Sequence, residues 1–269
     1  MSRKSRNFAR KVKNEKSMKF LIQKSPDRKV QLDFAYEMMQ AQQYYEWLNR
    51  DPLEIRWTMD ASFKRIENPD EYTPIGTVEF VRAYMKKFYP EAAKKAMNPL
   101  NVPEVFYPDA GRSIGTFDMS KDDPRTLFPD AKKVFCKSAT VIKHDGNGMY
   151  YMDALPKSGL WQISEYLDIL SEWRVFVHNG QIQHIANYSG DCMVFPDAEH
   201  IREMVRMWST IQPQECPKAY TLDVAVAAGR GTVVMEVHRF FSCGLYGFSD
   251  HNKIPVMFSQ EWFEMKLLK

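Results

Sequence analysis

The sequence lacks the features of a membrane-embedded or secreted protein. No apolar run in its 269 residues approaches the roughly 18 residues that a membrane-spanning helix needs. The first segment, "MSRKSRNFARKVKNEKS", begins with basic residues, but the apolar stretch of a secretory signal does not follow. The four cysteines form no CxxC pair and have no histidine nearby at zinc spacing. We therefore expect reduced thiols in a cytoplasmic protein that does not associate with membranes.

Basic residues are concentrated at the start of the chain. Residues 1–17 carry seven Lys or Arg and one acid, a charge of +6, whereas the whole chain carries +3, so the remainder carries −3. The remainder therefore lacks the basic surface that is typical of nucleic-acid-binding proteins. The tail is either a disordered, solvated extension or a weak electrostatic contact for RNA or DNA.

The first half of the chain predicts a small α/β lobe. Hydrophobic residues make up 44% of the sequence, which is enough for a sizeable core. Helical spacing over residues 33–48 and 76–89 flanks an alternating strand over residues 53–60. Strand and helix therefore alternate in this part of the chain. Prolines and aspartates are frequent over residues 99–129, where we expect loop with little regular structure.

The second half predicts an antiparallel sheet with helices packed on one side, and the whole chain is therefore α+β. The dipeptide Asn179-Gly180 lies between two strand-like runs and is a strong hairpin signal. Apolar residues recur at helical spacing over residues 197–211, and a final short helix is expected around residues 259–268.

A second hairpin, "YTLDVAVAAGRGTVVMEVHRF", places an acid in each of two apolar strands. A turn at Gly229 and Arg230 puts Asp223 directly opposite Glu236, and a four-residue loop preserves that register. The expected apolar face holds Leu222, Val224, Val226, Val233, Met235 and Val237, and the opposite face holds Thr221, Asp223, Ala225, Val234, Glu236 and His238. Opposed carboxylates repel each other unless a cation lies between them, and oxygen ligands favour Mg²⁺ or Mn²⁺. The alternative is an exposed polar face whose acids stand apart or pair with Lys and Arg.

Two lysines upstream lie where phosphate oxygens could bind. Lys137 stands inside an apolar strand, where an unpartnered charge is costly. Lys143 precedes a loop with Gly146 and Gly148, whose backbone N–H groups suit phosphates, although a plain polar hairpin tip is an equal alternative. Residues 143–146 also spell the KxDG motif of covalent nucleotidyltransferases. However, no Glu-Gly pair and no KxK follow, so we treat that match as accidental.

Further acids follow the next strand. Glu165 ends a strand, and Glu172 and Arg174 begin another after a short interval. The segment from Glu165 through Tyr166 to Leu167 could offer a carboxylate and backbone groups to an adenine, and Glu172 could accept ribose hydroxyls. Each acid alone is also explained as a surface residue.

Taken together, these segments resemble the ATP-grasp superfamily, and more closely its divergent clade proposed to ligate amino acids or peptides. The resemblance spans roughly residues 74–250 and is carried by "TPIGTVEFV", "VFCKS", "SEWRVFV", "YTLDVAV" and "MEVHRFFSCGLYG". It implies two lobes of antiparallel sheet and helices that enclose a nucleotide, preceded by a small α/β lobe. The implied organisation is a tail over 1–17, an N-terminal lobe over 18–115, a small lobe and hinge over 116–170, and a large lobe over 171–269.

The resemblance also implies a role for each candidate residue. Lys137, Lys143 and the loop glycines Gly146 and Gly148 would hold the phosphates of ATP; Glu165, Tyr166 and Leu167 would face adenine, and Glu172 the ribose. Asp223 and Glu236 would bind Mg²⁺, with Mn²⁺ as a second possibility, and Arg174 or Lys218 would neutralise the phosphoryl group. His238 stands where the family usually has a metal-binding Asn, which leaves open a changed metal preference, a weakened site or a loss of turnover.

The implied activity is an ATP-dependent carboxylate–amine ligase that acts through an acyl-phosphate and releases ADP and phosphate. Its substrates would be small molecules or peptides that supply a carboxylate and an amine. Two alternatives stay open: a non-catalytic nucleotide-binding adaptor with the same fold, and a nucleotidyltransferase or nucleic acid ligase that uses Lys143.

Overall fold

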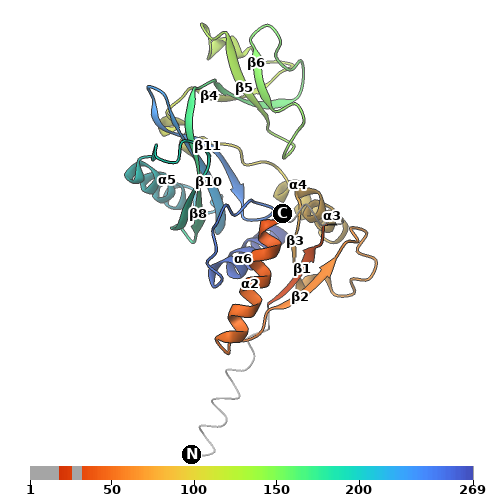
Figure 1. Cartoon of the computed structure of the whole chain (residues 1–269). Coiled ribbons are helices and arrows are strands. Elements are labelled where there is room, and N and C mark those ends of the chain that lie inside the picture. The colour runs from red at the N-terminus through yellow and green to blue at the C-terminus, as the bar shows by residue number, and fades with distance from the viewer. Residues whose placement is uncertain (1–17, 26–31, 269) are drawn as a thin grey trace, which may run out of the picture.

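The computed structural model describes residues 18–25 and 32–268, so the basic tail lies outside the described residues. Three sheets follow one another through the molecule, with helices packed between and beside them (Figure 1). The observed class is α+β, as the sequence predicts. The sheets occupy residues 19–75, 114–165 and 169–239. The lobe boundaries at 115/116 and 170/171 stay a prediction.

The first sheet is parallel. Its strands are β1 (Lys19–Gln23), β2 (Glu54–Thr58) and β3 (Tyr72–Ile75), in the order β2-β1-β3. Parallel neighbours need crossover connections, and α2 (Asp33–Trp47) supplies the one between β1 and β2. Two further helices follow β3, α3 (Val78–Phe88) and α4 (Pro90–Ala96). The predicted helices and the strand in this region are confirmed, whereas β3 was not predicted.

The second sheet is antiparallel. It contains β4 (Ile114–Asp118), β5 (Lys133–Ser138), β6 (Gly148–Tyr151) and β7 (Leu160–Glu165), in the order β4-β7-β5-β6. The prediction of loop over residues 99–129 is wrong for β4 and for two short 3₁₀ helices, Glu104–Asp109 and Pro124–Thr126. β4 has only two buried apolar side chains, at Ile114 and Phe117, and its partner β7 lies more than 40 residues away in the sequence, too far for any local pattern to reveal the pairing.

The third sheet carries the two predicted hairpins. It is antiparallel, with β8 (Ile169–His178), β9 (Gln181–Gly190), β10 (Ala219–Ala227) and β11 (Gly231–Arg239) in the order β11-β10-β8-β9. Asn179 and Gly180 have φ values of 50° and 70°, which are the positive values that a tight hairpin turn requires. Helix α5 (Ala198–Ile211) is capped by Asp197 and buries its predicted stripe (Ile201, Met204, Val205, Trp208).

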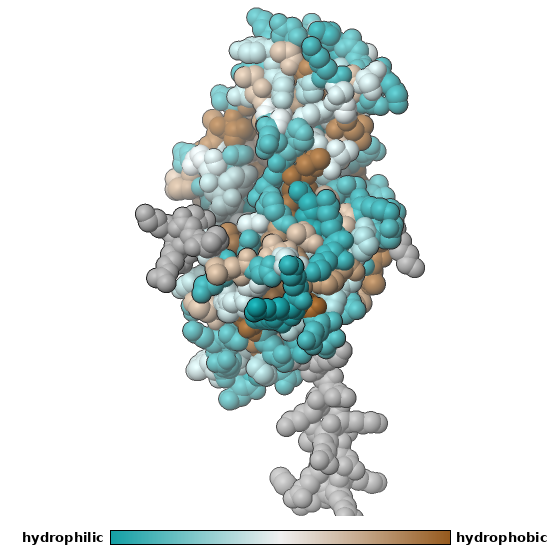
Figure 2. Space-filling view, turned by 90° about the vertical axis from the view of Figure 1, so that its right-hand side faces the viewer, coloured by the Kyte–Doolittle hydropathy of each residue, from teal (hydrophilic) through white to brown (hydrophobic). Residues whose placement is uncertain are grey.

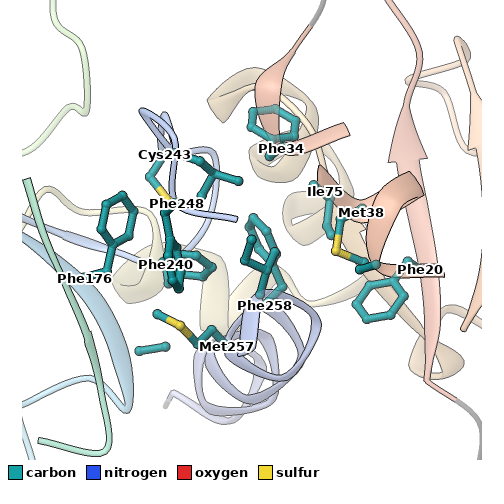
Figure 3. Packing of buried hydrophobic residues seen from close by; sticks show 14 of the residues in the cluster. Phe20, Phe34, Met38, Ile75, Phe176, Phe240, Cys243, Phe248, Met257 and Phe258 are labelled. Atoms are coloured by element: carbon teal, nitrogen blue, oxygen red, sulfur yellow. The ribbon is translucent and has the colours of Figure 1, made fainter. Parts of the chain in front are cut away.

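The first and third sheets share one apolar core. Helix α6 (Lys253–Leu267) begins earlier than predicted and packs against α2, α4, β3 and β10. Figure 3 shows aromatic and aliphatic side chains of both sheets meeting beside α6, including Phe20 from β1, Met38 from α2 and Phe176 from β8. Arg239 on β11 also donates to the buried Glu261 of α6 at 2.7 Å. These contacts fasten the first and third sheets into one unit.

The surface is predominantly hydrophilic on the face shown in Figure 2, where hydrophobic residues form small separate areas. Within residues 18–25 and 32–268, no helix is both long enough and apolar enough to span a membrane.

We predict that two glycines with similar backbone angles differ in how well they tolerate alanine. Gly229 has φ of 69° and nothing within 4 Å of an added Cβ, so Gly229→Ala should cost about 1 kcal/mol from backbone strain. Gly190 has φ of 73°, and an added Cβ would lie 2.3 Å from the Leu170 carbonyl oxygen. Gly190→Ala should therefore lower the free energy of unfolding by roughly 3 kcal/mol, because strain and overpacking add. Urea denaturation of both variants tests this, and equal losses would contradict it.

Candidate functional site

The register of the second hairpin places the two acids opposite each other. Asp223 on β10 pairs with Glu236 on β11, as predicted. The turn differs, because Ala227 pairs with Gly231 and three residues remain in the loop. A β-bulge follows, since Asp223 faces Glu236 while the next residue, Val224, faces Val234.

The bulge changes which side chains share a face. Met235 is the extra residue, and residues before it on β11 are shifted by one position. Val234 therefore packs with Leu222 and Val224, whereas Val233 and Met235 lie on the side of Ala225. The predicted faces are wrong for Val233, Val234 and Met235, because a uniform alternation ignores the bulge. They are right around the two acids.

Asp223 is held by an arginine. The Nε and Nη2 atoms of Arg174 donate to the two carboxylate oxygens of Asp223 at 2.8 and 2.7 Å, and Asp223 is only 1% exposed. Burial alone would lower the pKa of Arg174, but the Asp223 carboxylate outweighs burial and raises it. Arg174 also donates to the Gly244 carbonyl at 3.1 Å. Both partners are thus committed to each other, and neither is free as the predicted metal ligand or phosphoryl-neutralising group.

Glu236 has different partners. Lys137 Nζ, from the second sheet, forms an ion pair with one Glu236 oxygen, and His238 Nε2 lies 2.7 Å from the other. Burial would raise the pKa of Glu236, but Lys137 and His238 outweigh burial and hold that pKa well below its usual range. The Glu236 side chain is 24% exposed, so it can reach a ligand.

Two pockets meet at this ion pair, because Lys137 and Glu236 line both. One pocket, of about 270 Å³, lies at the hinge between β7 and β8, and we call it the hinge pocket. The other, of about 220 Å³, lies beneath the loop after β5, and we call it the loop pocket. An extended ligand with a charged centre could occupy both pockets and place its charge at Lys137.

The hinge pocket has apolar walls and a polar rim. Its walls come from Phe135, Leu167, Ile169, Met235 and the ring of Tyr166. Within the described residues, no hydrogen bond uses the backbone N–H or carbonyl of Leu167, so both remain open to a ligand. These are the features that bind a flat heteroaromatic ring by stacking and by edge hydrogen bonds.

The two predicted acids of the hinge line this pocket. Glu165 is paired with Arg230, from the turn between β10 and β11, and Glu172 accepts from the Tyr188 hydroxyl at 3.4 Å. Glu172 is the more weakly bonded of the two. It is therefore the acid with more freedom to accept ligand hydroxyls.

The loop pocket brings residues together from all three sheet regions. Val78 of α3, Lys143 of the loop after β5, and Tyr246 of the segment after β11 all line it. Lys143 has φ of 54°, an uncommon conformation for a residue with a side chain. Cys243 also lines this pocket, but burial raises the pKa of its thiol to about 12, so it is not a thiolate at neutral pH.

Some predicted residues are not brought to the pockets. Lys218 lines neither pocket; its backbone carbonyl accepts from Asn179 N–H at the far end of β10. Gly146 donates its N–H to His144 at 2.9 Å, and Gly148 begins β6, so it is their neighbour Asn147 that lines the loop pocket. Proximity in the sequence was a poor guide in these three cases.

Arg112 is a site residue that sequence reasoning missed. It lines the hinge pocket and donates to the carbonyl of the bulged residue Met235 at 3.3 Å, as Lys137 does at 3.5 Å. Its buried Nε has no hydrogen-bond partner, and burial lowers the pKa of the guanidinium to about 10. The unpaired donor beside Lys137 suits an anion. Its position in a predicted loop gave no signal.

We compared the chain with known proteins. A family model for an ATP-grasp domain, the second family of one clade within that superfamily, matches residues 111–256, which is more than half of the chain. A search of curated proteins found no match.

Solved structures share the fold at low sequence identity. D-cycloserine synthetase DcsG is 9% identical, with a TM-score of 0.60 over 92% of this chain and 99% of its own. D-alanine–D-alanine ligase from Bacillus anthracis, complexed with ATP, is 11% identical, with a TM-score of 0.56 over 93% and 99%. ATP-grasp ligase PsnB, complexed with a minimal precursor, is 10% identical, with a TM-score of 0.51 over 91% and 98%. At this identity the likeness shows a shared fold.

We predict that Asp223→Asn destabilises the protein more than Glu236→Gln does, with no ligand present. The first change leaves the buried Arg174 charge uncompensated, which should cost about 3–5 kcal/mol. Glu236→Gln leaves partners that are 18% and 27% exposed and can be solvated, so its loss should be smaller. Urea denaturation of the unliganded variants measures both. Similar small losses would show that the Arg174–Asp223 pair is not a structural element.

Proposed function

Because the chain belongs to the ATP-grasp superfamily, we propose that it is an ATP-dependent carboxylate–amine ligase. The observation that carries this proposal is the meeting of the hinge and loop pockets at Lys137 and Glu236. A nucleotide base in one pocket and an acid substrate in the other would bring the γ-phosphate and the carboxylate together at that junction.

The hinge pocket is the proposed site of adenine and ribose. Its apolar walls suit the faces of a purine, and the free N–H and carbonyl of Leu167 suit the purine edge. Glu172 lines the same pocket and could accept the ribose hydroxyls. Tyr166 supports this wall through the ammonium of Lys133, which lies 3.7 Å from its ring centroid.

The phosphates would lie along the cations at the junction. Lys137 is the proposed partner of the α- and β-phosphates, and Arg112 could use its free Nε there. Lys143 lines the loop pocket and could cover the γ-phosphate. Glu236 and His238 are the residues best placed to hold a divalent cation, because both line the loop pocket and Asp223 does not. Such a cation would neutralise charge on the phosphates.

The proposed reaction has two steps. A carboxylate oxygen of the acid attacks the γ-phosphorus, the bond to the β-phosphate oxygen breaks, and ADP leaves with that electron pair. An uncharged amine then attacks the acyl carbon, the bond to the phosphate oxygen breaks, and the nitrogen loses a proton to give the amide. No covalent bond to the protein is needed, which agrees with the high pKa of Cys243, about 12.

The acid and amine substrates are left open by this proposal. The names of the fold neighbours describe two small-molecule enzymes and one ligase bound to a precursor peptide. The loop pocket of about 220 Å³ is large enough for a small acid or for the end of a peptide. Its walls combine the cation Lys143 with apolar side chains such as Val78 and Ile142.

One observation favours a second candidate, a non-catalytic nucleotide-binding protein of the same fold. Asp223 is consumed by Arg174, and His238 replaces the asparagine expected beside Glu236. Both changes reduce the number of oxygen ligands available for Mg²⁺. Such a protein would bind ATP without transferring its phosphate.

We predict that Lys137→Met lowers ATP affinity by at least about tenfold, which is the loss of one charge-assisted phosphate contact. A matched control is Lys121→Met in the same sheet region, because Lys121 is exposed and paired with Asp118. Fluorescence titration with a labelled ATP analogue measures both affinities. Equal affinities for the two variants would remove Lys137 from the proposed nucleotide site.

We predict that an acid substrate labelled with ¹⁸O in its carboxylate transfers one ¹⁸O atom to the released phosphate. The acyl-phosphate retains one carboxylate oxygen on phosphorus when the amine attacks carbon. The measurement is mass spectrometry of phosphate after incubation with ATP, labelled amino acids and a pool of amines. ADP release with labelled phosphate supports the ligase. Tight ATP binding with no ADP release across the pool supports the non-catalytic alternative.

A further inference from the structure

The residues available to a divalent cation in this site form an unusual donor set. Glu236 and His238 line the loop pocket, and His238 Nε2 lies 2.7 Å from a Glu236 oxygen. Asp223 lines neither pocket, and both of its oxygens already accept hydrogen bonds from Arg174. Within the described part of the chain, no group of three or more His, Cys, Asp or Glu residues is assembled as a metal site. The protein thus offers one carboxylate and one imidazole.

This pair can complete a site only together with a nucleotide. Metal ions in phosphoryl-transfer sites are commonly held by one or two protein groups, with phosphate oxygens and water as the remaining ligands. The junction of the two pockets, where Lys137 also lies, is the place where those phosphates would come. The number of protein ligands is therefore sufficient, and what is unusual is the nitrogen.

The nitrogen changes which cation is favoured. Mg²⁺ is a hard cation that prefers six oxygen ligands, whereas imidazole suits Mn²⁺, Co²⁺, Zn²⁺ and other first-row transition metals increasingly well. Only one of the two candidate protein ligands here is an oxygen donor. Replacing an amide oxygen by an imidazole nitrogen should weaken Mg²⁺ binding relative to a transition metal, while the nucleotide contacts at the hinge stay the same.

We propose that His238 is a direct ligand of the nucleotide-bound cation and makes the site selective for a divalent transition metal such as Mn²⁺ or Co²⁺ over Mg²⁺. This inference rests on the proposed binding of ATP at the junction of the hinge and loop pockets. It does not depend on the identity of the acid or the amine, nor on whether the chain turns over.

A competing role for His238 is to position Glu236 from outside the coordination shell. Its contact to the carboxylate would serve that role equally well. A nitrogen bound directly to Mn²⁺ gives a ¹⁴N coupling in the electron spin echo of the metal, whereas a carboxylate-bound histidine does not. The two roles therefore differ in a signal that needs no catalytic activity.

The experiment uses the full chain with a non-hydrolysable ATP analogue. Titration with Mn²⁺ and with Mg²⁺ gives two dissociation constants for the native protein, for His238→Asn, and for the control His200→Asn. His200 is a histidine of α5 that lines neither the hinge nor the loop pocket. Spin-echo spectra of the Mn²⁺ complexes accompany the titrations, and affinity for the analogue without metal is measured for each protein.

We expect the native protein and His200→Asn to bind Mn²⁺ at least about tenfold more tightly than Mg²⁺ and to show ¹⁴N coupling. His238→Asn should lose the coupling and most of that preference, while its metal-free affinity for the analogue stays unchanged. An unchanged Mn²⁺/Mg²⁺ ratio in His238→Asn, or no ¹⁴N coupling in the native complex, would overturn the inference alone. Failure of all three proteins to bind the analogue would contradict the proposed function, and this inference with it.

Discussion

The ion pair between Lys137 and Glu236 is the interaction on which the site depends. It joins the second sheet to the third, and it stands at the boundary of both pockets. A carboxylate in such a buried position is stable only if a cation balances it, and Lys137 supplies that cation in the protein without ligand. A phosphate chain that entered this junction would compete for Lys137, and a metal ion would take its place at Glu236. The same two side chains could thus hold the site together before binding and receive the ligand afterwards.

The neighbouring pair, Arg174 and Asp223, has a different physical character. Its atoms are almost fully buried, both carboxylate oxygens are bonded, and the partners lie on adjacent strands in the middle of the third sheet. Removing either charge would leave the other without compensation, so the pair constrains the sheet more than it serves a ligand. Two acids that look equivalent in the sequence therefore differ, because one faces an arginine on β8 and the other faces the pockets.

How far the sequence predicts this site depends on the range of each signal. The Asn179-Gly180 turn and the opposition of Asp223 and Glu236 follow from short-range alternation, and both are confirmed. The bulge at Met235 could not be predicted, because nothing in "TVVMEV" marks an extra residue. Strand β4 is too short to show a period.

Contacts between distant segments were also out of reach. Lys137 and Glu236 are 99 residues apart, and Arg174 and Asp223 are 49 apart. Alternation indicates which face of a strand a side chain occupies, but it does not indicate which residue of another element lies opposite. The resemblance to a family supplied the two lobes and the nucleotide, and those expectations come from the whole pattern of segments. Arg112 carried no signal at either level, since its importance arises from a buried Nε without a partner.

The way in which the three sheets are joined suggests how a ligand would be enclosed. The first and third sheets share an apolar core beside α6, whereas the second sheet has a core of its own, with Phe117, Val134 and Trp161 among its members. Its links to the rest are largely polar: Gln162 exchanges hydrogen bonds with the backbone of Val102, and Asn101 donates to the Ser138 carbonyl. Polar contacts can be exchanged for others at little net cost, while an apolar core cannot be opened without exposing it. The second sheet is consequently the part that can move toward a nucleotide, and Lys137, which it carries, is the side chain that such a movement would reposition.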